Sequence, residues 1–449
     1  MNLLTIAYKS IRQRALASSL TAFSVALGVM LMVTVLVIHG VVDRMFSQTA
    51  TGYDLIIGPK GSKLQLVLNA IYRVSQPIEN LPYRFYRELK EDKRIEIALP
   101  LALGDTTQEG GFTIVGTIPE YFVTEYMPGR TFQGNGELIA KPFDAIIGSN
   151  VARTNGWDIG QTFRLIHGGN EEHVHDEEFT VVSVLRPTGT PNDKTVFVNL
   201  KGFYMVQGHD KPIEEAVRRV ADFYNEDVDE EELARKVKKA AEDEAAHASN
   251  DGHHHQHDIL EVQKEVTAIL IRMKTRENSS VSIYTPGFQS EINKGFKAQA
   301  VNPIGEIKWL MDNIVGHVRT MLVVMTSLII VVSGVSIFVS IYNSMSDRRR
   351  EIAIMRALGA SRQTVFSIIM SESTLLCVAG GVIGLVLGHG LVFLASPIVE
   401  AQSGLPLDPF AFEPMELVLL PMLIVLASLI GFIPGMTAYR TDVAETLAD

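Results

Sequence analysis

Histidine is the residue type in this 449-residue chain whose spacing could most plainly support chemistry. His173 and His175 stand two residues apart, and His167 precedes the pair Gly168-Gly169. Side chains two apart on a strand share a face, so a hairpin that turns at these glycines would gather three imidazoles. Three imidazoles on one face suit zinc, copper or nickel. His167, His173 and His175 are therefore one candidate metal site, with the register of the hairpin left open.

A second histidine cluster occupies residues 251–258. Its candidate ligands are His253, His254, His255 and His257. A loose tract of this kind could wrap a metal ion without a preformed cage, and zinc is the ion that we favour. The same composition also fits a solvated surface tract that binds nothing. Because the tract is internal and interrupted, an expression tag is a poor explanation for it.

The motifs of common enzymes are missing from the sequence. There is no Gly-Lys dipeptide and so no Walker A loop, no His-Glu dipeptide for a zinc protease helix, and no Gly-x-Ser-x-Gly elbow. We therefore expect no catalytic residue, no enzyme activity and no resident cofactor beyond the candidate zinc. With 40 basic and 51 acidic residues the net charge is −11, which disfavours nucleic acid as a partner. The single cysteine, Cys377, cannot form an internal disulfide.

Four long runs of the sequence contain no charged residue, and membrane-spanning helices there would determine on which side of a membrane the histidines lie. The runs are residues 15–42, 320–346, 373–399 and 417–439. A helix needs about 20 apolar residues to cross the hydrocarbon layer, and each run is longer than that. Residues 322–341 also lack the polar stripe of a surface helix. Basic residues precede the first run as in a signal peptide, but the run is far longer than an h-region, so we interpret it as a retained anchor.

Basic residues in the short segments predict the orientation. They lie in an amphipathic N-terminal helix, residues 1–14, and crowd residues 347–372, whereas the charged residues of 400–416 are all acidic. We expect a multi-pass protein of the bacterial cytoplasmic (inner) membrane. Residues 1–14, 347–372 and 440–449 are then cytoplasmic, so both termini lie inside, and residues 43–319 and 400–416 lie outside.

The long segment 43–319 is expected to fold as one β-rich domain. Apolar runs bounded by glycine predict strands at 54–58, 111–116 and 144–148, and residues 163–167 and 179–185 predict a hairpin. Further strands are expected at 195–200, 266–274 and 281–284, and helices at 64–72 and 306–319. The predicted fold class is an α+β membrane protein with four transmembrane helices and one large β-rich extracytoplasmic domain between helices 1 and 2.

Residues 210–265 differ in composition from the rest of this domain. They hold 17 acidic and 8 basic residues, which is most of the charge imbalance of the chain. A solvated helical insertion, broken near Asn225, is the expected structure.

The segment from Arg348 to Ser361 is predicted to form a short amphipathic helix between two spans. Its apolar Ile352, Met355 and Gly359 share a face. Gly359 is suited to end that helix, and Ser361 to cap the next one. A helix held in this way could be gripped by a soluble motor, although an ordinary basic loop beside the membrane explains the same residues.

Glycines recur every four residues in the third uncharged run. Gly380, Gly384 and Gly388 therefore lie on one helix face. Rows of small residues let two helix backbones approach closely in lipid, so this face is predicted to pack on a neighbouring helix.

Residues Glu351 to Ala360 resemble the signature of the FtsX-like, or MacB-type, permeases of ABC transporters. The plan of four spans with one large domain after the first is similar to theirs, and Gly58 to Ser62 resembles the DevC and heme-exporter-like branches. The resemblance implies a homo- or heterodimer of permeases bound to two copies of a separate ATP-binding subunit, which would hold the ATP and magnesium. It also implies that Glu351, Ile352, Arg356, Ala357 and Gly359 couple the chain to that ATPase.

Two functional hypotheses follow from the resemblance. In the first, ATP-driven motion reaches the outer domain for export or envelope transport. The histidines link this transport to zinc, and a periplasmic or outer-membrane protein is an expected further partner. In the second, an FtsX-like regulator drives an extracytoplasmic enzyme such as a cell-wall hydrolase and transports no solute. A metal carrier that works without ATP is disfavoured, because the spans lack the polar ligands that such a carrier needs.

Overall fold

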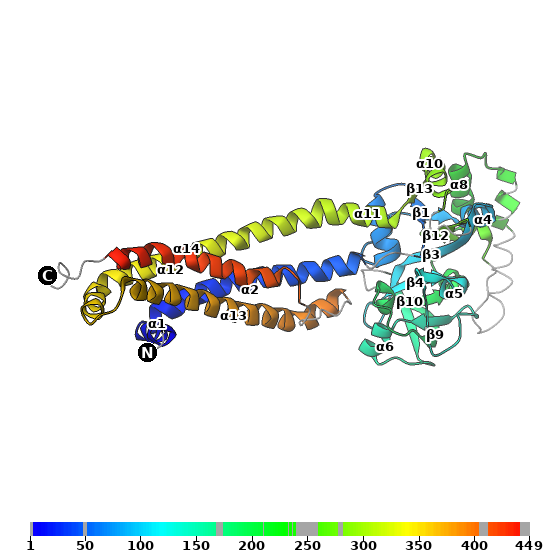
Figure 1. Ribbon diagram of the computed structural model, residues 1–449. Coiled ribbons are helices and arrows are strands. Elements are labelled where there is room, and N and C mark those ends of the chain that lie inside the picture. The colour runs from blue at the N-terminus through cyan, green and yellow to red at the C-terminus, as the bar shows by residue number, and fades with distance from the viewer. Residues whose placement is uncertain are drawn as a thin grey trace. The chain divides into compact units, whose positions relative to one another are not determined.

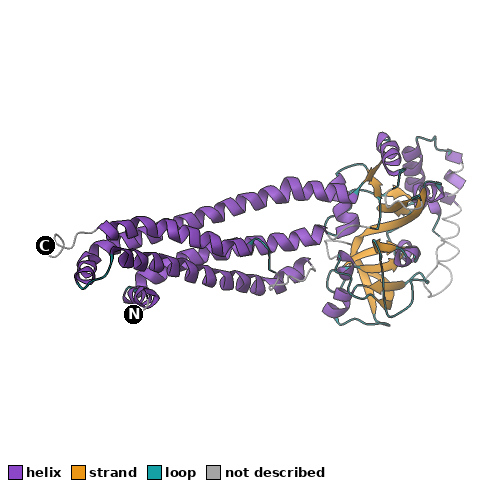
Figure 2. Cartoon of the chain, viewed as in Figure 1, coloured by secondary structure: helices purple, strands orange, loops and turns teal. Residues whose placement is uncertain are grey.

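The computed structural model describes residues 3–47, 52–167, 174–209, 211–231, 233–235, 237–238, 259–276, 282–403 and 412–440. The chain divides into two compact units. We call Met1–Phe46 with Met311–Asp449 the helical unit, and Ser47–Leu310 the β-rich unit. Figure 1 shows the course of the chain, and Figure 2 separates helix from strand.

The helical unit contains long apolar helices. Its elements are α1 (Leu3–Gln13), α2 (Ala15–Ser47), η4 (Met311–Val315), α12 (Gly316–Ala357), α13 (Arg362–Ser403) and α14 (Glu416–Arg440). Among the described residues, 4 helices are long and apolar enough to cross a membrane. They run within α2, α11 to α12, α13 and α14, so the predicted set of four apolar helices is confirmed.

Aliphatic side chains form the core of the helical unit. Contributors include Val29 of α2, Ile330 of α12, Cys377 of α13 and Ala427 of α14, all of them fully buried. Tight packing of such surfaces is what holds helices together in lipid, where the hydrophobic effect between helices is absent. The helices α13 and α14 run side by side (Figure 1).

One mixed sheet organises the β-rich unit. Its strand order is β13-β1-β12-β3-β4-β10-β7-β9-β8, with a further pairing of β3 with β8. The strands are β1 (Leu55–Pro59), β3 (Ile95–Thr107), β4 (Thr113–Thr117), β7 (Asp144–Ile147), β8 (Thr162–His167), β9 (Val174–Val184), β10 (Val196–Asn199), β12 (Ala268–Met273) and β13 (Ala298–Val301). The long β3 joins both halves, because its first part pairs with β12 and its last part with β4 and β8.

Helices and short strands complete the unit. They are α3 (Lys63–Val67), η1 (Leu68–Tyr72), β2 (Leu81–Pro82), α4 (Tyr83–Glu91), α5 (Glu120–Val123), β5 (Glu125–Met127), β6 (Arg130–Thr131), α6 (Ser149–Asn155), η2 (Pro191–Lys194), α7 (Leu200–Met205), α8 (Ile213–Tyr224), η3 (Glu261–Gln263), β11 (Glu265–Val266), α10 (Thr285–Lys294) and α11 (Pro303–Leu310). One core lies where α4 and α10 cover β1, β12 and β3, and includes Tyr86 and Phe288. A second core lies among β4, β7, β8, β9 and β10 and includes Phe179.

Most of the predicted local structure of the β-rich unit is confirmed. The three glycine-bounded runs are β1, β4 and β7, and the predicted hairpin is β8 with β9, in which Phe163 pairs with Phe179. The predicted strand at 281–284 is wrong over its described residues, 282–284. These form a turn into α10, whose first turn contains Pro286, a residue that favours helix starts over strand interiors.

The acidic insertion begins as predicted with a helix. The helix α8 ends at Asn225, which has a left-handed φ of 58°. Arg84 of α4 pairs with Glu226 at 2.9 Å, so this end is tied to the body of the unit by a surface ion pair. Residues 239–258, including the tract His253 to His257, lie outside the described residues.

Candidate functional site

The predicted short helix is the final part of one long helix. Residues 347–357 continue α12 without a break, and α13 begins at Arg362, so the turn between them is only 358–361. The prediction of a separate short helix was wrong, because the charged residues there are also good helix formers and no glycine or proline interrupts them before Gly359.

The turn after α12 has the predicted caps. Gly359 has a φ of 101°, which favours glycine, and its N–H donates to the carbonyl of Arg356 at 3.0 Å. The hydroxyl of Ser361 accepts from the backbone N–H of Thr364 at 3.1 Å. These two caps hold the end of α12 and the start of α13 in a defined reversal.

The end of α12 presents different residues to its two sides. Ile352 and Ala353 are 4% and 0% exposed, and Ile352 belongs to the core of the bundle with Met355 packed against it. On the other side Ile354 is 46% exposed and Leu358 is 84% exposed. Because these two residues are four apart, they form an apolar pair on one outward face.

The remaining predicted coupling residues lie around that pair. Arg356 is half-buried, whereas Ala357 and Gly359 are exposed. Glu351 lies in α12, and its side chain is outside the described set. Ile352, which the resemblance implied as a coupling residue, is buried in the bundle, and sequence reasoning missed the exposed Ile354 and Leu358. Their i, i+4 spacing was the signal that could have revealed them.

The glycine row of α13 faces α2. A Cβ at Gly380 would lie 2.7 Å from the carbonyl oxygen of Ala22, and a Cβ at Gly384 would lie 2.6 Å from that of Ala26. At Gly388 the nearest atom would be Cβ of Val33, at 2.8 Å. The two helix backbones thus approach as closely as glycine allows. A similar approach, not foreseen from the sequence, occurs at Gly431 of α14, where a Cβ would lie 2.4 Å from Oγ of Ser373.

A buried acid and a histidine join α13 to the start of α14. Nε2 of His389 lies 3.0 Å from Oε2 of Glu416, whose side chain is 0% exposed. Oε1 of the same carboxylate accepts from the backbone N–H of Glu413 at 3.2 Å, and Phe412 stacks on the imidazole. Sequence reasoning treated His389 as a packed histidine and missed its partner, because the pair is 27 residues apart.

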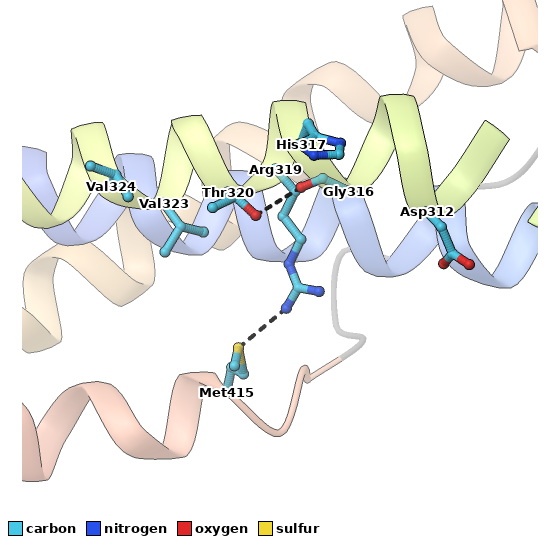
Figure 3. Close-up of a pocket in the computed structure, with 8 residues that line it drawn as sticks. All are labelled: Asp312, Gly316, His317, Arg319, Thr320, Val323, Val324 and Met415. Atoms are coloured by element: carbon cyan, nitrogen blue, oxygen red, sulfur yellow. Dashed lines mark hydrogen bonds between the residues drawn. The ribbon is translucent and has the colours of Figure 1, made fainter. Parts of the chain in front are cut away.

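A pocket of about 430 Å³ lies beside the first turns of α12 (Figure 3). Its lining residues are Asp312, Gly316, His317, Arg319, Thr320, Val323, Val324 and Met415. Arg319 reaches from α12 toward α14 and donates to Sδ of Met415 at 3.4 Å. The pocket therefore combines a guanidinium with valine and methionine side chains.

The predicted histidine hairpin is described only in part. His173 lies outside the described residues, as does the side chain of His167, whose backbone pairs with Asp105 across β8 and β3. His175 is buried, and its ring lies 5.1 Å from that of His209. Nε2 of His209 in turn lies 2.9 Å from Oδ2 of Asp105. Within the described ranges, no three His, Cys, Asp or Glu side chains come together as a metal-binding group.

Comparison with known proteins places these features in a family. Residues 18–248, more than half of the chain, match the MacB-like periplasmic core domain, and residues 323–443 match the FtsX-like permease C-terminal domain. The chain belongs to the FtsX-like permeases with a MacB-like periplasmic core. The periplasmic core match thus covers most of α2 and the larger part of the β-rich unit, and the FtsX-like match covers most of α12 together with α13 and α14.

Individual relatives match different shares of the chain. The macrolide export ATP-binding/permease protein MacB of Rhodopirellula baltica is 29% identical over 150 residues, which cover 33% of this FtsX-like chain and 21% of that protein. An uncharacterised ABC transporter permease of Methanocaldococcus jannaschii is 20% identical over 467 residues, covering 99% of this chain and 97% of that protein. The aligned part thus spans about a fifth of the first relative. The crystal structure of the periplasmic region of MacB from Actinobacillus actinomycetemcomitans aligns with a TM-score of 0.32 at 11% identity, over 58% of this chain and 95% of that one.

Proposed function

We propose that this chain is the membrane-spanning permease subunit of an ABC transporter of the MacB/FtsX type. Two copies of a separate ATP-binding subunit dock on a permease dimer from the cytoplasm, where both termini of this chain lie. Their ATP-driven movement is passed through the helical unit to the periplasmic domain, for export or envelope transport. The family membership supports the permease role.

The observation that carries the proposal is the two-sided end of α12. Ile352 and Ala353 are buried against the bundle, so this end cannot shift without moving the bundle. Ile354 and Leu358 project from the opposite side and offer a partner an apolar contact. Such burial of apolar side chains is the usual centre of a stable interface, and Arg356 beside it supplies a polar rim.

Helical continuity supports transmission along the chain. The described residues 303–357 are helical throughout, as α11, η4 and α12 follow one another directly. In this proposal a movement applied at the end of α12 is passed along that helix toward η4. In this proposal the π-helical turn η4 is the point at which the helix can bend.

Co-purification tests the proposal. The full-length protein is expected to retain an ATP-binding subunit through detergent extraction, and Leu358→Asp should release it. Val123→Asp is the matched control, because Val123 is 65% exposed on the β-rich unit and remote from α12 in sequence. Retention of the ATPase by Leu358→Asp to the level of the control would reject the docking role. A cell-wall hydrolase recovered on the periplasmic domain would favour the regulatory alternative over transport.

The zinc link is a second part of the proposal. The packing of His175 beside His209 and Asp105 places two further ligand-type residues next to the predicted hairpin, which is the observation in its favour. His167, His173 and the tract His253 to His257 complete the set of proposed ligands. Calorimetric titration of the full-length protein with zinc should give saturable binding that weakens in His175→Ala. If the titration shows only non-specific heats, the proposal that the protein binds zinc is rejected.

A further inference from the structure

The guanidinium of Arg319 lies at the start of an apolar span. Arg319 is the last charged residue before the uncharged run 320–346, so it lies where the apolar span begins. It is half-buried, yet among the residues that the structure describes it has no carboxylate partner. Its contact there is with the sulfur of Met415, and a thioether is a weak acceptor for a group with five N–H donors. The charge is therefore poorly satisfied by the protein around it.

The pocket around Arg319 has two kinds of wall. Arg319 and His317 can donate hydrogen bonds and lie in the first turns of α12, and the apolar Val323 and Val324 follow further along the same helix (Figure 3). Beyond the pocket, Leu328 and Val331 continue the exposed apolar surface of α12. A ligand that contacts both the polar and the apolar part of this lining must have an anionic end and an apolar end.

We propose that this pocket binds the phosphate-bearing headgroup of a membrane lipid. Its phosphate would accept from the guanidinium of Arg319, whose planar fork matches two phosphate oxygens. Its acyl chains would lie along the exposed valines of α12. A free phosphate ion lacks the second of these contacts, so the site favours a lipid over a soluble anion.

Asp312 gives the site a distinctive electrostatic signature. Its carboxylate lines the same pocket and is exposed. A carboxylate near a bound phosphate repels it, whereas Arg319 attracts it. Removing each charge should therefore change lipid binding in opposite directions, which a purely structural role of these residues would not produce.

Lipid titration of the full-length protein in detergent tests the site. Dioctanoyl phosphatidylglycerol is the probe, and dioctanoylglycerol and inorganic phosphate are compared with it. Arg319→Gln should weaken phosphatidylglycerol binding about tenfold, Arg319→Lys should weaken it less, and Asp312→Asn should strengthen it. Lys308→Gln is the matched control, because Lys308 is exposed and does not line the pocket, and it should leave binding unchanged.

Three results would overturn the proposal. One is binding by Arg319→Gln and Arg319→Lys that equals the wild type, with both variants folded by thermal unfolding. Another is equal affinity for dioctanoylglycerol, which would show that the phosphate makes no contribution. The last is competition by inorganic phosphate at the concentrations where phosphatidylglycerol binds, which would assign the site to a soluble anion.

Discussion

Gly384 of α13 lies against Ala26 of α2 so closely that a Cβ on the glycine would come within 2.6 Å of the alanine carbonyl oxygen. The same contact recurs one turn earlier, between Gly380 and Ala22. At these two positions there is no room for a side chain on α13. A close approach of this kind over two turns packs α2 tightly against α13 within the helical unit.

The first prediction concerns this contact. Gly384→Val should destabilise the helical unit by about 1–3 kcal/mol, the usual effect of overpacking a tight interior. Gly390→Val is the matched control on the same helix, since a Cβ at Gly390 would have nothing within 4 Å. Thermal unfolding in detergent measures the difference. Equal midpoints for the two variants would show that the glycine row is not required for packing.

The second prediction concerns the end of α12. Replacing Glu351 and Arg356 together by Ala should uncouple ATP hydrolysis from the periplasmic domain without unfolding the chain. Arg356 lies beside the Ile354 and Leu358 pair and Glu351 lies one turn earlier in the sequence of α12, so the double variant removes two charges near the proposed interface and no residue of the bundle core. Two measurements are compared: the ATPase activity of the reconstituted complex, and the function of the same variant in cells. Wild-type function in the double variant would count against their coupling role.

The third prediction concerns His389 and Glu416. His389→Ala should lower the free energy of unfolding by about 1–3 kcal/mol, because it removes the imidazole hydrogen bond from the fully buried Glu416 carboxyl group. The double variant His389→Leu with Glu416→Gln should recover part of that loss, since the buried acid is then replaced by a neutral amide beside an apolar side chain. Denaturation of the single and double variants provides the comparison. If the single variant is as stable as the wild type, the imidazole does not stabilise the acid.

The fourth prediction concerns acid stability of the β-rich unit. Arg94 donates to Asp92 at 2.7 Å and to Glu291 at 2.6 Å. The hydrogen bonds from Arg94 lower the pKa of Asp92 and the pKa of Glu291. A carboxyl with a lowered folded pKa stabilises the protein above its unfolded pKa, and this contribution is lost as the pH falls through the folded pKa.

The matching variant is Arg94→Met. At pH 7 this variant should lower the free energy of unfolding by about 1 kcal/mol, a small value because Glu291 is largely solvent-exposed. The difference from the wild type should persist down to about pH 4 and shrink below it, as both carboxyls become protonated in either protein. Unfolding measured across pH 2 to pH 7 tests this. A difference that grows toward low pH would contradict the assigned sign.

The sequence predicted what depends on neighbouring residues. The four apolar helices follow from the length of uncharged runs, and the strands β1, β4 and β7 follow from short apolar runs between glycines. The caps at Gly359 and Ser361 are equally local, because each depends on one residue and the turn beside it.

Features that depend on tertiary packing could not be predicted from the sequence alone. Which face of α12 meets the bundle is decided by the other helices, so neither the burial of Ile352 nor the exposure of Ile354 was predicted. The pair of His389 with Glu416 joins two helices, and neither residue is unusual in its own segment. The continuity of α12 was missed for a different reason, since a run of arginines resembles a loop although it also favours helix.

Side-specific labelling tests the central claim, that the end of α12 lies across the membrane from the β-rich unit and holds the ATPase. The native Cys377 is buried, so introduced cysteines can be labelled selectively. In intact cells a membrane-impermeant maleimide should label Val123→Cys but not Leu358→Cys. In inside-out vesicles Leu358→Cys should be labelled, and bound ATP-binding subunit should protect it. Labelling of both cysteines from the same side of the membrane would contradict the account.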